Sequence, residues 1–293
     1  MFNKILHKIR NRELIKYIKW KFSYKKLRLN IKRGLIYTKN LNLMFNKDPF
    51  VKVRSKHGRI VINLNDIYIS NSIIENGTWE IDEINFLKEL LLQHKNIYGD
   101  GVVALDCGAN LGVHTLEFSK LMKNWGEVHS FEPQKQVYNA LSKTLSLNKT
   151  ANVYSYNLAL GKEEAFIEVP KLDYTKKLNF GGLELNQHGG VPKIDNQSFE
   201  KLATYKVRLR TIDSFNFKRV DLVKIDVEGM ELDVLRGGKE MLLNLKPIIF
   251  YEVSKSNEIE LKKYLELYNY KIIKHINNNS VAIFKDSEIT FPR

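Results

Sequence analysis

The stretch Asp106-Cys107-Gly108-Ala109-Asn110-Leu111-Gly112 places two glycines between a buried strand and a helix. The apolar run Val102–Leu105 before it predicts the strand, and the residues up to Met122 predict the helix. Gly108 permits a tight turn and lets a ligand approach the backbone, whereas Gly112 is expected to pack near the strand. A strand, a glycine turn and a helix in this order predict a ligand site at the carboxyl end of a parallel sheet.

The glycine spacing distinguishes this turn from a nicotinamide-binding one. The nicotinamide fingerprint G-x-G-x-x-G places three glycines around a pyrophosphate. Here Asp106 replaces the first glycine, and the gap between Gly108 and Gly112 is wider. A carboxylate would repel a pyrophosphate but suits a cationic cofactor such as S-adenosylmethionine, which carries an ammonium and a sulfonium. Asp106 is therefore the residue that argues against a nicotinamide oxidoreductase.

Polar side chains also follow the next two predicted strands. Glu132 comes directly after the strand Glu127–Phe131, where a carboxylate can accept hydrogen bonds from both hydroxyls of a ribose. Asn157, in the predicted strand Asn152–Leu160, either borders an adenine or forms a turn. We therefore expect Asp106 and Glu132 to line one negatively charged pocket at adjacent strand tips.

Strands and helices alternate from residue 99 to the C-terminus, which predicts an α/β fold with a doubly wound, mostly parallel sheet. A closing hairpin adds an antiparallel strand, and residues 170–203 form an irregular insertion of a length that is usually functional or mobile. The other predicted helices are 134–147, 231–243 and 258–267, and the other predicted strands are 165–169, 207–210, 222–226, 248–253, 270–276 and 280–284.

Two further parts precede this predicted domain of residues 99–293. Residues 50–98 predict short strands at Val51–Arg54, Arg59–Asn63 and Tyr68–Ile69, then a helix from Ile81 to His94, all packing on or covering the core. The predicted apolar face of this helix comprises Ile84, Leu87, Leu90 and Leu91. Residues 1–49 predict a basic helical arm.

The net charge of +14 is concentrated in this arm. Residues 1–40 contain 13 Lys and Arg against one acid, Glu13, and so carry +12. The basic amphipathic pattern of residues 1–33 is compatible with contact with an anionic membrane surface or with nucleic acid. The third interpretation is a solvated helix that packs on the main domain or on a second subunit of a homo-oligomer.

Composition predicts a cytoplasmic protein, membrane-associated on the cytoplasmic face if the arm binds lipid. Cys107 is the single cysteine, which excludes an intramolecular disulfide and suits a reducing compartment. No apolar run reaches the roughly 18–20 residues of a membrane span, and the N-terminus lacks a signal-peptide pattern. The seven histidines lack metal-ligand spacing, so we expect no structural zinc site.

Four motifs in order, Val103–Gly112, Phe131–Pro133, Arg210–Asp213 and Leu222–Glu231, resemble those of the FkbM-type methyltransferases. Phe180–Leu185 and Gly77–Glu80 resemble features of one subgroup. The resemblance implies the seven-stranded methyltransferase fold, S-adenosylmethionine as donor, and usually a hydroxyl acceptor on a sugar, glycan or secondary metabolite. The predicted cofactor contacts are Asp106, Gly108, Ala109, Asn110, Gly112, His114, Glu132, Asn157 and Asp226.

The predicted catalytic residues lie at two neighbouring strand ends. Lys224, Asp226 and Glu228 alternate along one strand, so their side chains are expected to face the same crevice. An attacking alcohol needs a base, and paired carboxylates raise the pKa of one of them. We predict Glu228 as the base ahead of Asp226, with Lys224 offsetting the repulsion. Glu252, at the end of the next strand, is a third candidate.

Several alternatives stay open at this point. In one alternative, Asp226 and Glu228 cap the following helix and form an ion pair with Lys224; in another, His114 is a packed or capping residue. A third has two or three of the carboxylates holding Mg²⁺, which orients a diol acceptor, whereas the predicted site contains no metal. The Asp/Asn-Pro-Pro-aromatic motif of base-amine methylases is absent, which favours O-methylation. RNA methylation assisted by the basic arm and non-catalytic binding of S-adenosylmethionine are the alternative functions. The acceptor pocket is expected from residues 40–95 and 170–203.

Overall fold

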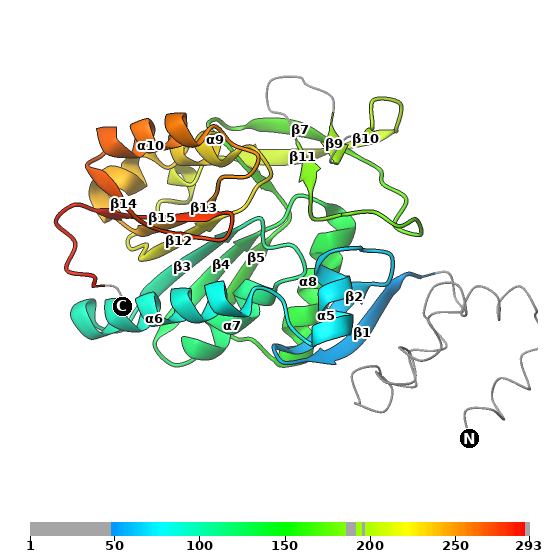
Figure 1. Ribbon diagram of the computed structural model, residues 1–293, viewed down its shortest axis with the longest axis horizontal. Helices are drawn as coiled ribbons and strands as arrows, with labels where there is room; N and C mark the ends of the chain where they lie inside the picture. The colour runs from blue at the N-terminus through cyan, green and yellow to red at the C-terminus, as the bar shows by residue number, and fades with distance from the viewer. Residues whose placement is uncertain (1–47, 186–191, 195–196, 291–293) are drawn as a thin grey trace, which may run out of the picture.

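A central seven-stranded sheet organises the molecule (Figure 1). The computed structural model describes residues 48–185, 192–194 and 197–290. In spatial order the strands are β14 (Tyr270–Ile276), β15 (Asn279–Phe284), β13 (Ile248–Glu252), β12 (Leu222–Ile225), β3 (Val102–Cys107), β4 (Gly126–Phe131) and β5 (Val153–Tyr156). β15 alone runs opposite to the other six strands of this sheet. The predicted α/β class and the mostly parallel seven-stranded sheet are confirmed.

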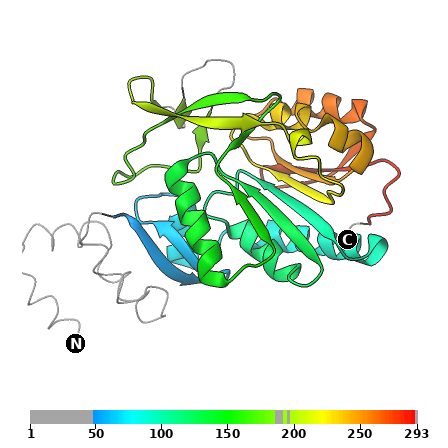
Figure 2. The same cartoon turned by 180° about the vertical axis from the view of Figure 1, so that it is seen from behind.

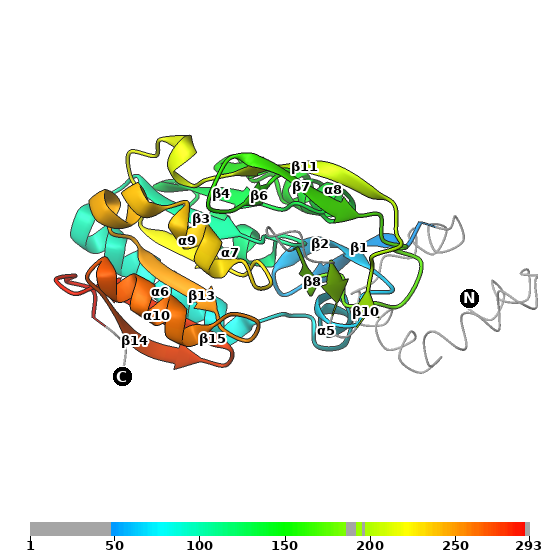
Figure 3. The same ribbon diagram turned by 90° about the horizontal axis from the view of Figure 1, so that it is seen from above.

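Helices cover both faces of the sheet because successive side chains point to opposite faces and those on both faces are mostly apolar. In β3, Val102 and Ala104 pack with α6 (Ile81–Tyr98) and α7 (Val113–Leu121) on one face. Val103 and Leu105 pack with α9 (Glu231–Arg236) and α10 (Glu258–Leu267) on the other. Figure 1 shows α9 and α10 above the sheet and α6 and α7 below it, and in the view from above α9 and α10 lie in front (Figure 3). The predicted apolar face of α6, comprising Ile84, Leu87, Leu90 and Leu91, is buried as expected.

The strands before residue 99 pack against the α/β part of the molecule. The hairpin of β1 (Phe50–Ser55) and β2 (Gly58–Asn63) lies beside α8 (Lys135–Asn148), as Figure 2 shows. The Val61 amide donates to Thr144 Oγ1 at 3.0 Å, and Asn148 hydrogen-bonds both the amide and the carbonyl of Arg59. The hairpin therefore shares a core with α8, while the division of the chain at residues 49 and 98 stays a prediction.

Three predicted elements differ from the structure. The expected strand Tyr68–Ile69 is wrong: Tyr68 precedes α5 (Ile69–Asn76), because Ile69 and the buried Ile73 lie one helical turn apart. The predicted strand Asn152–Leu160 is divided into β5 and β6 (Ala159–Leu160). The predicted helix 231–243 is interrupted after α9 and continues as the π-helix η3 (Met241–Leu245).

The insertion contains more regular structure than its sequence indicated. β8 (Leu183–Glu184), β9 (Lys193–Ile194) and β10 (Gln197–Ser198) form a small antiparallel sheet. A second sheet joins β6 to β11 (Thr204–Arg210) and β7 (Ala165–Pro170). Phe180, Leu183 and Leu185 are buried in an apolar cluster together with residues of these strands. This shared burial stabilises the short strands of the insertion.

The predicted basic helix at residues 1–33 lies outside the described residues. Within the described ranges, none of the helices has the length and apolar character needed to cross a membrane.

Glu117 of α7 connects the hairpin to two helices. Its carboxylate lies 3.1 Å from Lys88 Nζ of α6, 2.7 Å from Lys120 Nζ, and 3.6 Å from Nδ1 of His57 in the turn between β1 and β2. Burial alone would raise the pKa of Glu117, but the interactions with His57, Lys120 and Lys88 outweigh it and hold the pKa at about 2. The ionised carboxylate therefore stabilises the docking of the hairpin.

Replacing this carboxylate is expected to destabilise the fold. Glu117→Gln should lower the free energy of unfolding at pH 7 by about 1–3 kcal/mol, because charge-assisted hydrogen bonds are lost from a nearly buried site. Because the native pKa lies below the unfolded value, the difference should be full above about pH 5 and fade as the pH falls toward 2. Urea denaturation measures the loss of unfolding free energy and its pH dependence, and Glu266→Gln, at an exposed position, is the matched control. A constant difference down to pH 2 would contradict the ion-pair explanation.

Candidate active site

A cavity of about 310 Å³ opens at the carboxyl ends of β3, β4, β12 and β13. Its wall combines strand tips with two segments outside the sheet, the one before α6 and the Asn179–Leu185 part of the insertion. Residues on this wall include Tyr68, Trp79, Glu80, Gly108, Asn110, Phe131, Glu132, Leu158, Asn179, Gly181, Asp226, Glu228, Met230, Glu252 and Lys255. The position agrees with the general rule that open α/β sheets bind ligands at the carboxyl ends of their strands.

Gly108 is required by the neighbouring strand as well as by the cavity. Its φ of +80° is in the left-handed region, and a Cβ there would lie 1.8 Å from the carbonyl oxygen of Asp226. Gly112, at φ +83°, would place a Cβ 2.4 Å from Leu141 Cδ1 of α8. The prediction that Gly112 packs near the strand is therefore wrong; it packs against a helix.

Glu132 lies on the cavity wall and shapes the glycine turn. Its Oε2 accepts a hydrogen bond from the Asn110 amide at 3.0 Å, and its Oε1 accepts one from the Gln134 amide at 2.8 Å. Burial raises the pKa of Glu132 to about 7 against the opposing effect of these bonds. Each carboxylate oxygen keeps a further lone pair, so an additional donor can bind.

Asp106 does not share this wall, which corrects the sequence-based expectation of a common pocket. Its side chain is fully buried: Oδ2 accepts from Thr115 Oγ1 at 2.6 Å, and Oδ1 lies 3.3 Å from Lys224 Nζ. Asp106 and Lys224 are direct partners in the register of β3 and β12, so their side chains leave the sheet on the same face. The acid is therefore matched by a lysine and is not available at the cavity surface.

Four other predicted cofactor contacts are not part of the wall either: Ala109, Gly112, His114 and Asn157. His114 is 5% exposed and packs edge-on against Phe118, and burial lowers its pKa to about 3. Asn157 Nδ2 donates to the carbonyls of Glu132 and Pro133 at 2.8 and 3.1 Å, so it fixes the loop after β4. Gly108, Asn110, Glu132 and Asp226 are the predicted cofactor contacts that do line the cavity.

Lys224 is a buried cation beneath the cavity. Its Nζ lies 3.3 Å from both Asp106 Oδ1 and Asp226 Oδ2 and donates to the Gly108 carbonyl at 3.1 Å. Burial alone would lower the pKa of Lys224, but the charges of Asp226 and Asp106 outweigh it and raise the pKa above its usual range. Lys224 thus remains charged and joins the tips of β3 and β12.

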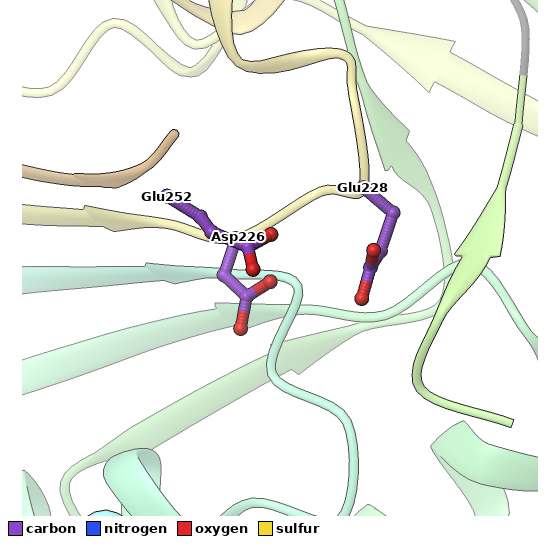
Figure 4. Close-up of side chains that lie close together, drawn as sticks. All are labelled: Asp226, Glu228 and Glu252. Atoms are coloured by element: carbon purple, nitrogen blue, oxygen red, sulfur yellow. The ribbon is translucent and has the colours of Figure 1, made fainter. Parts of the chain in front are cut away.

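Asp226, Glu228 and Glu252 gather at the rim of the cavity (Figure 4). One carboxylate oxygen from each lies within 4.8 Å of the others. Burial, followed by the charge of Asp226, raises the pKa of Glu228 to about 8, although Lys255 Nζ lies only 2.7 Å away and opposes the shift. Burial likewise raises the pKa of Glu252. The predicted catalytic carboxylates are therefore brought together.

The loop that carries Glu228 is held by a different acid. Glu231 accepts hydrogen bonds from the amides of Val227 and Gly229 and contacts Ser256 Oγ. Glu231 thus fixes the loop that precedes α9, whereas no side chain caps the N-terminus of this helix, so the capping that the alternative interpretation gave to Asp226 and Glu228 is not found. Asp226 does pair with Lys224, as that alternative expected, whereas Glu228 pairs with Lys255.

A second cavity, of about 380 Å³, adjoins the first. The two share Glu80, Asp226, Glu252 and Asn278, so the carboxylate rim lies between them. The remaining wall of the second cavity is polar and includes Ser72, Thr78, Asp82, Glu83, Asn277 and Asn279. Among the described residues that line it there is no Lys or Arg. This cavity therefore favours neutral or cationic polar ligands.

Sequence reasoning missed several cavity residues. Trp79 and Glu80 belong to the Gly77–Glu80 segment, and Gly181 belongs to the Phe180–Leu185 segment. Both segments stand out in the sequence, but their roles depend on contacts across the fold. Lys255 gave no signal, because its partner Glu228 is 27 positions away and its carbonyl partner Gly182 lies in the insertion.

Lys224→Met is expected to lower the free energy of unfolding at pH 7 by about 3–5 kcal/mol, because it leaves the buried Asp106 without a cation. Adding Asp106→Asn should recover part of the loss, since the unpaired charge is removed as well. Urea denaturation of the single and double variants measures the coupling, with the exposed Lys262→Met as control. A single variant as stable as the control would contradict the role of Lys224 as the buried counter-charge.

The chain is similar to methyltransferases in each comparison. Residues 106–272 match the family model described as the methyltransferase FkbM domain. Methyltransferase 1 of Beauveria bassiana (strain ARSEF 2860) is 26% identical over 153 residues, which cover 48% of this chain and 59% of that protein. Methyltransferase sdnD of Sordaria araneosa is 28% identical over 159 residues, covering 46% and 60%. The chain thus spans about three fifths of the length of these relatives.

Solved structures give weaker likenesses. The methyltransferase FkbM from Methylobacillus flagellatus KT is 17% identical with a TM-score of 0.43, covering 63% of this chain and 43% of that one. M. jannaschii TYW2 in complex with AdoMet is 15% identical with a TM-score of 0.40, covering 80% and 84%. The family assignment rests on the sequence match, which spans more than half of the chain. This protein belongs to the FkbM family of S-adenosylmethionine-dependent methyltransferases.

Proposed function

We propose that the protein transfers the methyl group of S-adenosylmethionine to a hydroxyl of a sugar, glycan or related small molecule. The observation that carries this proposal is the carboxylate rim of Asp226, Glu228 and Glu252, because two members of that rim are walls of both cavities. A donor in the first cavity and an acceptor in the second would meet at groups that can accept a proton.

The wall of the first cavity has chemically different parts that suit the different parts of the cofactor. Phe131 and Leu158 supply apolar wall for an adenine, and Glu132 between them supplies a carboxylate for the ribose hydroxyls. Gly108 and Asn110 supply backbone for the methionine portion. We infer that residues 99–293 form the cofactor-binding domain, that the Asn179–Leu185 part of the insertion closes one wall, and that Tyr68, Trp79 and Glu80 close another.

The second cavity suits a hydroxylated acceptor. Carboxylate and amide oxygens accept hydrogen bonds from hydroxyl groups, and the Asn277–Asn279 amides can also donate. Its acidic wall would repel a phosphate or a nucleic-acid backbone, which weighs against RNA as the acceptor. We therefore favour neutral or amine-bearing hydroxylated acceptors over phosphorylated ones.

Glu228 is the proposed general base: it lines the first cavity alone, and one of its carboxylate oxygens lies within 4.8 Å of oxygens of Asp226 and Glu252, which line both cavities. A base works best when its pKa is near the operating pH, and burial brings the pKa of Glu228 to about 8. Asp226 is held in the ion pair with Lys224, 3.3 Å away, and Glu252 accepts from Ser254 Oγ at 2.6 Å. As the acceptor oxygen attacks the methyl carbon, the carbon–sulfur bond breaks, S-adenosylhomocysteine leaves and the hydroxyl proton passes to Glu228. Alignment of oxygen, carbon and sulfur supplies the rest of the acceleration.

Methyl transfer from radiolabelled S-adenosylmethionine to a panel of acceptors tests the proposal. Neutral sugars and amino sugars should be labelled, whereas nucleotide sugars and RNA should not. Calorimetry should show that S-adenosylmethionine binds and that NAD does not. Glu132→Ala should weaken the binding of S-adenosylmethionine at least roughly tenfold, because hydrogen bonds to the ribose are lost. Labelling of RNA alone would overturn the assignment of the acceptor.

Glu228→Gln should lower kcat roughly 10²- to 10⁴-fold while cofactor affinity stays within about twofold, because only proton transfer is lost. In the wild type, kcat should rise with pH and level off above about pH 8, since the deprotonated carboxylate is the active form. Lys255→Met should move that rise to higher pH, because Lys255 opposes the raised pKa of Glu228. The pH profiles of kcat measure both effects, with Glu266→Gln as control. A larger loss of kcat in Glu252→Gln than in Glu228→Gln would transfer the role to Glu252.

A further inference from the structure

The Gly77–Glu80 segment completes the cofactor cavity although it precedes the family-matched region, residues 106–272. Trp79 and Glu80 are both on the wall of the first cavity, and Glu80 also lines the second. Phe131, Glu132 and Leu158, by contrast, line the first cavity alone. Glu80 therefore lies at the end of the cofactor cavity that is away from the proposed adenine and ribose surface.

Several hydrogen bonds hold this segment in place. Nε2 of the buried His57 lies 2.8 Å from Thr78 Oγ1 and accepts from the Trp79 amide at 3.1 Å. Ser72 Oγ donates to the Thr78 carbonyl at 2.9 Å, and the Lys56 amide donates to the Gly77 carbonyl at 2.7 Å. Contacts from β1–β2 and α5 thus converge on the residues next to Glu80. The carboxylate of Glu80 is carried by a fixed segment rather than by a free loop.

Glu80 faces the first turn of α7, which starts at the glycine turn of the cofactor site. Its Oε2 lies 3.7 Å from His114 Nε2, a buried nitrogen without a hydrogen-bond partner among the described residues. The N-terminus of α7 favours a ligand carboxylate because of its free amides and positive dipole end. A carboxylate opposite that end favours an ammonium. The two together match the zwitterion of an amino acid.

The balance of charge around Glu80 also calls for a cation. Lys224 lies 3.3 Å from both Asp106 and Asp226, so this one cation already faces two carboxylates before Glu80 is counted. His114 is kept neutral, because burial and the nearby Lys224 lower its pKa to about 3. Burial, then the charge of Asp226, raises the pKa of Glu80 to about 8, and Glu83 and Glu252 add to this shift against Lys224. In the empty site at neutral pH, a proton compensates the excess negative charge.

We propose that Glu80 binds the ammonium of the methionine portion of S-adenosylmethionine, the role that the sequence assigned to Asp106. The proposal rests on the cofactor occupying this cavity. The ammonium takes the place of the proton on Glu80, so cofactor binding releases a proton near neutral pH. His114 is a positioning residue that limits how deep the Glu80 carboxylate can lie.

Three ligands that differ in their charged groups test this assignment. S-adenosylmethionine carries ammonium and sulfonium, S-adenosylhomocysteine carries the ammonium without the sulfonium, and 5′-methylthioadenosine carries neither. Glu80→Gln should weaken the first two roughly 10- to 100-fold, the effect of a lost charge-assisted hydrogen bond, and leave 5′-methylthioadenosine within about twofold. Calorimetry at pH 7 in two buffers of different ionisation enthalpy should show proton release in the wild type and its loss in Glu80→Gln.

Glu89→Gln is the matched control, because this substitution removes the same charge from an exposed position on α6. Circular dichroism verifies that each variant is folded, and Glu80→Asp, which keeps the charge, should retain part of the affinity. Unchanged binding of S-adenosylmethionine in folded Glu80→Gln would overturn the proposal. A loss of affinity for S-adenosylmethionine alone would also overturn it, because that result would place Glu80 at the sulfonium. Failure of the wild type to bind any of the three ligands would instead contradict cofactor binding in this cavity.

Discussion

The buried contact between Lys224 and the two carboxylates of Asp106 and Asp226 is the constraint on which the site depends. It joins the tips of β3 and β12, the two strands whose ends form the floor of the cofactor cavity. A charge in this position is costly unless it is paired, so neither strand tip can move without disrupting the pair. The close approach of Gly108 to the Asp226 carbonyl fixes the same two tips sterically. Charge and shape thus impose one geometry on the floor of the cavity.

This pairing also decides which acids remain for ligands. Because Asp106 is used beneath the floor, the negative character of the cavity comes from Glu80, Glu132 and the rim carboxylates. Burial raises the pKa of Glu80 and Glu228 to about 8 and that of Glu132 to about 7, so the empty site holds protons that a cationic ligand can displace. A site of this kind combines affinity for a positively charged donor with groups that can accept the acceptor's proton.

The central sheet and most of its helices were predictable from the sequence because their signals are local. Apolar runs and helical spacing marked β3, β4, α6 and α10, and the order of strands and helices indicated a parallel sheet. The prediction failed where local patterns are ambiguous. Tyr68–Ile69 begins a helix, and residues 170–203 contain short strands that form because Phe180, Leu183 and Leu185 find a shared apolar cluster. A two-residue strand has no periodicity of its own to detect.

The sequence by itself determined the fold class, the glycine turn, the acid after β4 and the cluster of carboxylates after β12 and β13. Each of these follows from spacing along a strand or a turn, and neighbouring parallel strands bring their ends together. Only the tertiary structure decided that Asp106 faces Lys224 and not the cavity, and that Glu80, from a segment before the family-matched region, lines the cavity. The physical reason is that the solvent exposure of a carboxylate depends on what packs over it, and the covering residues come from distant parts of the chain.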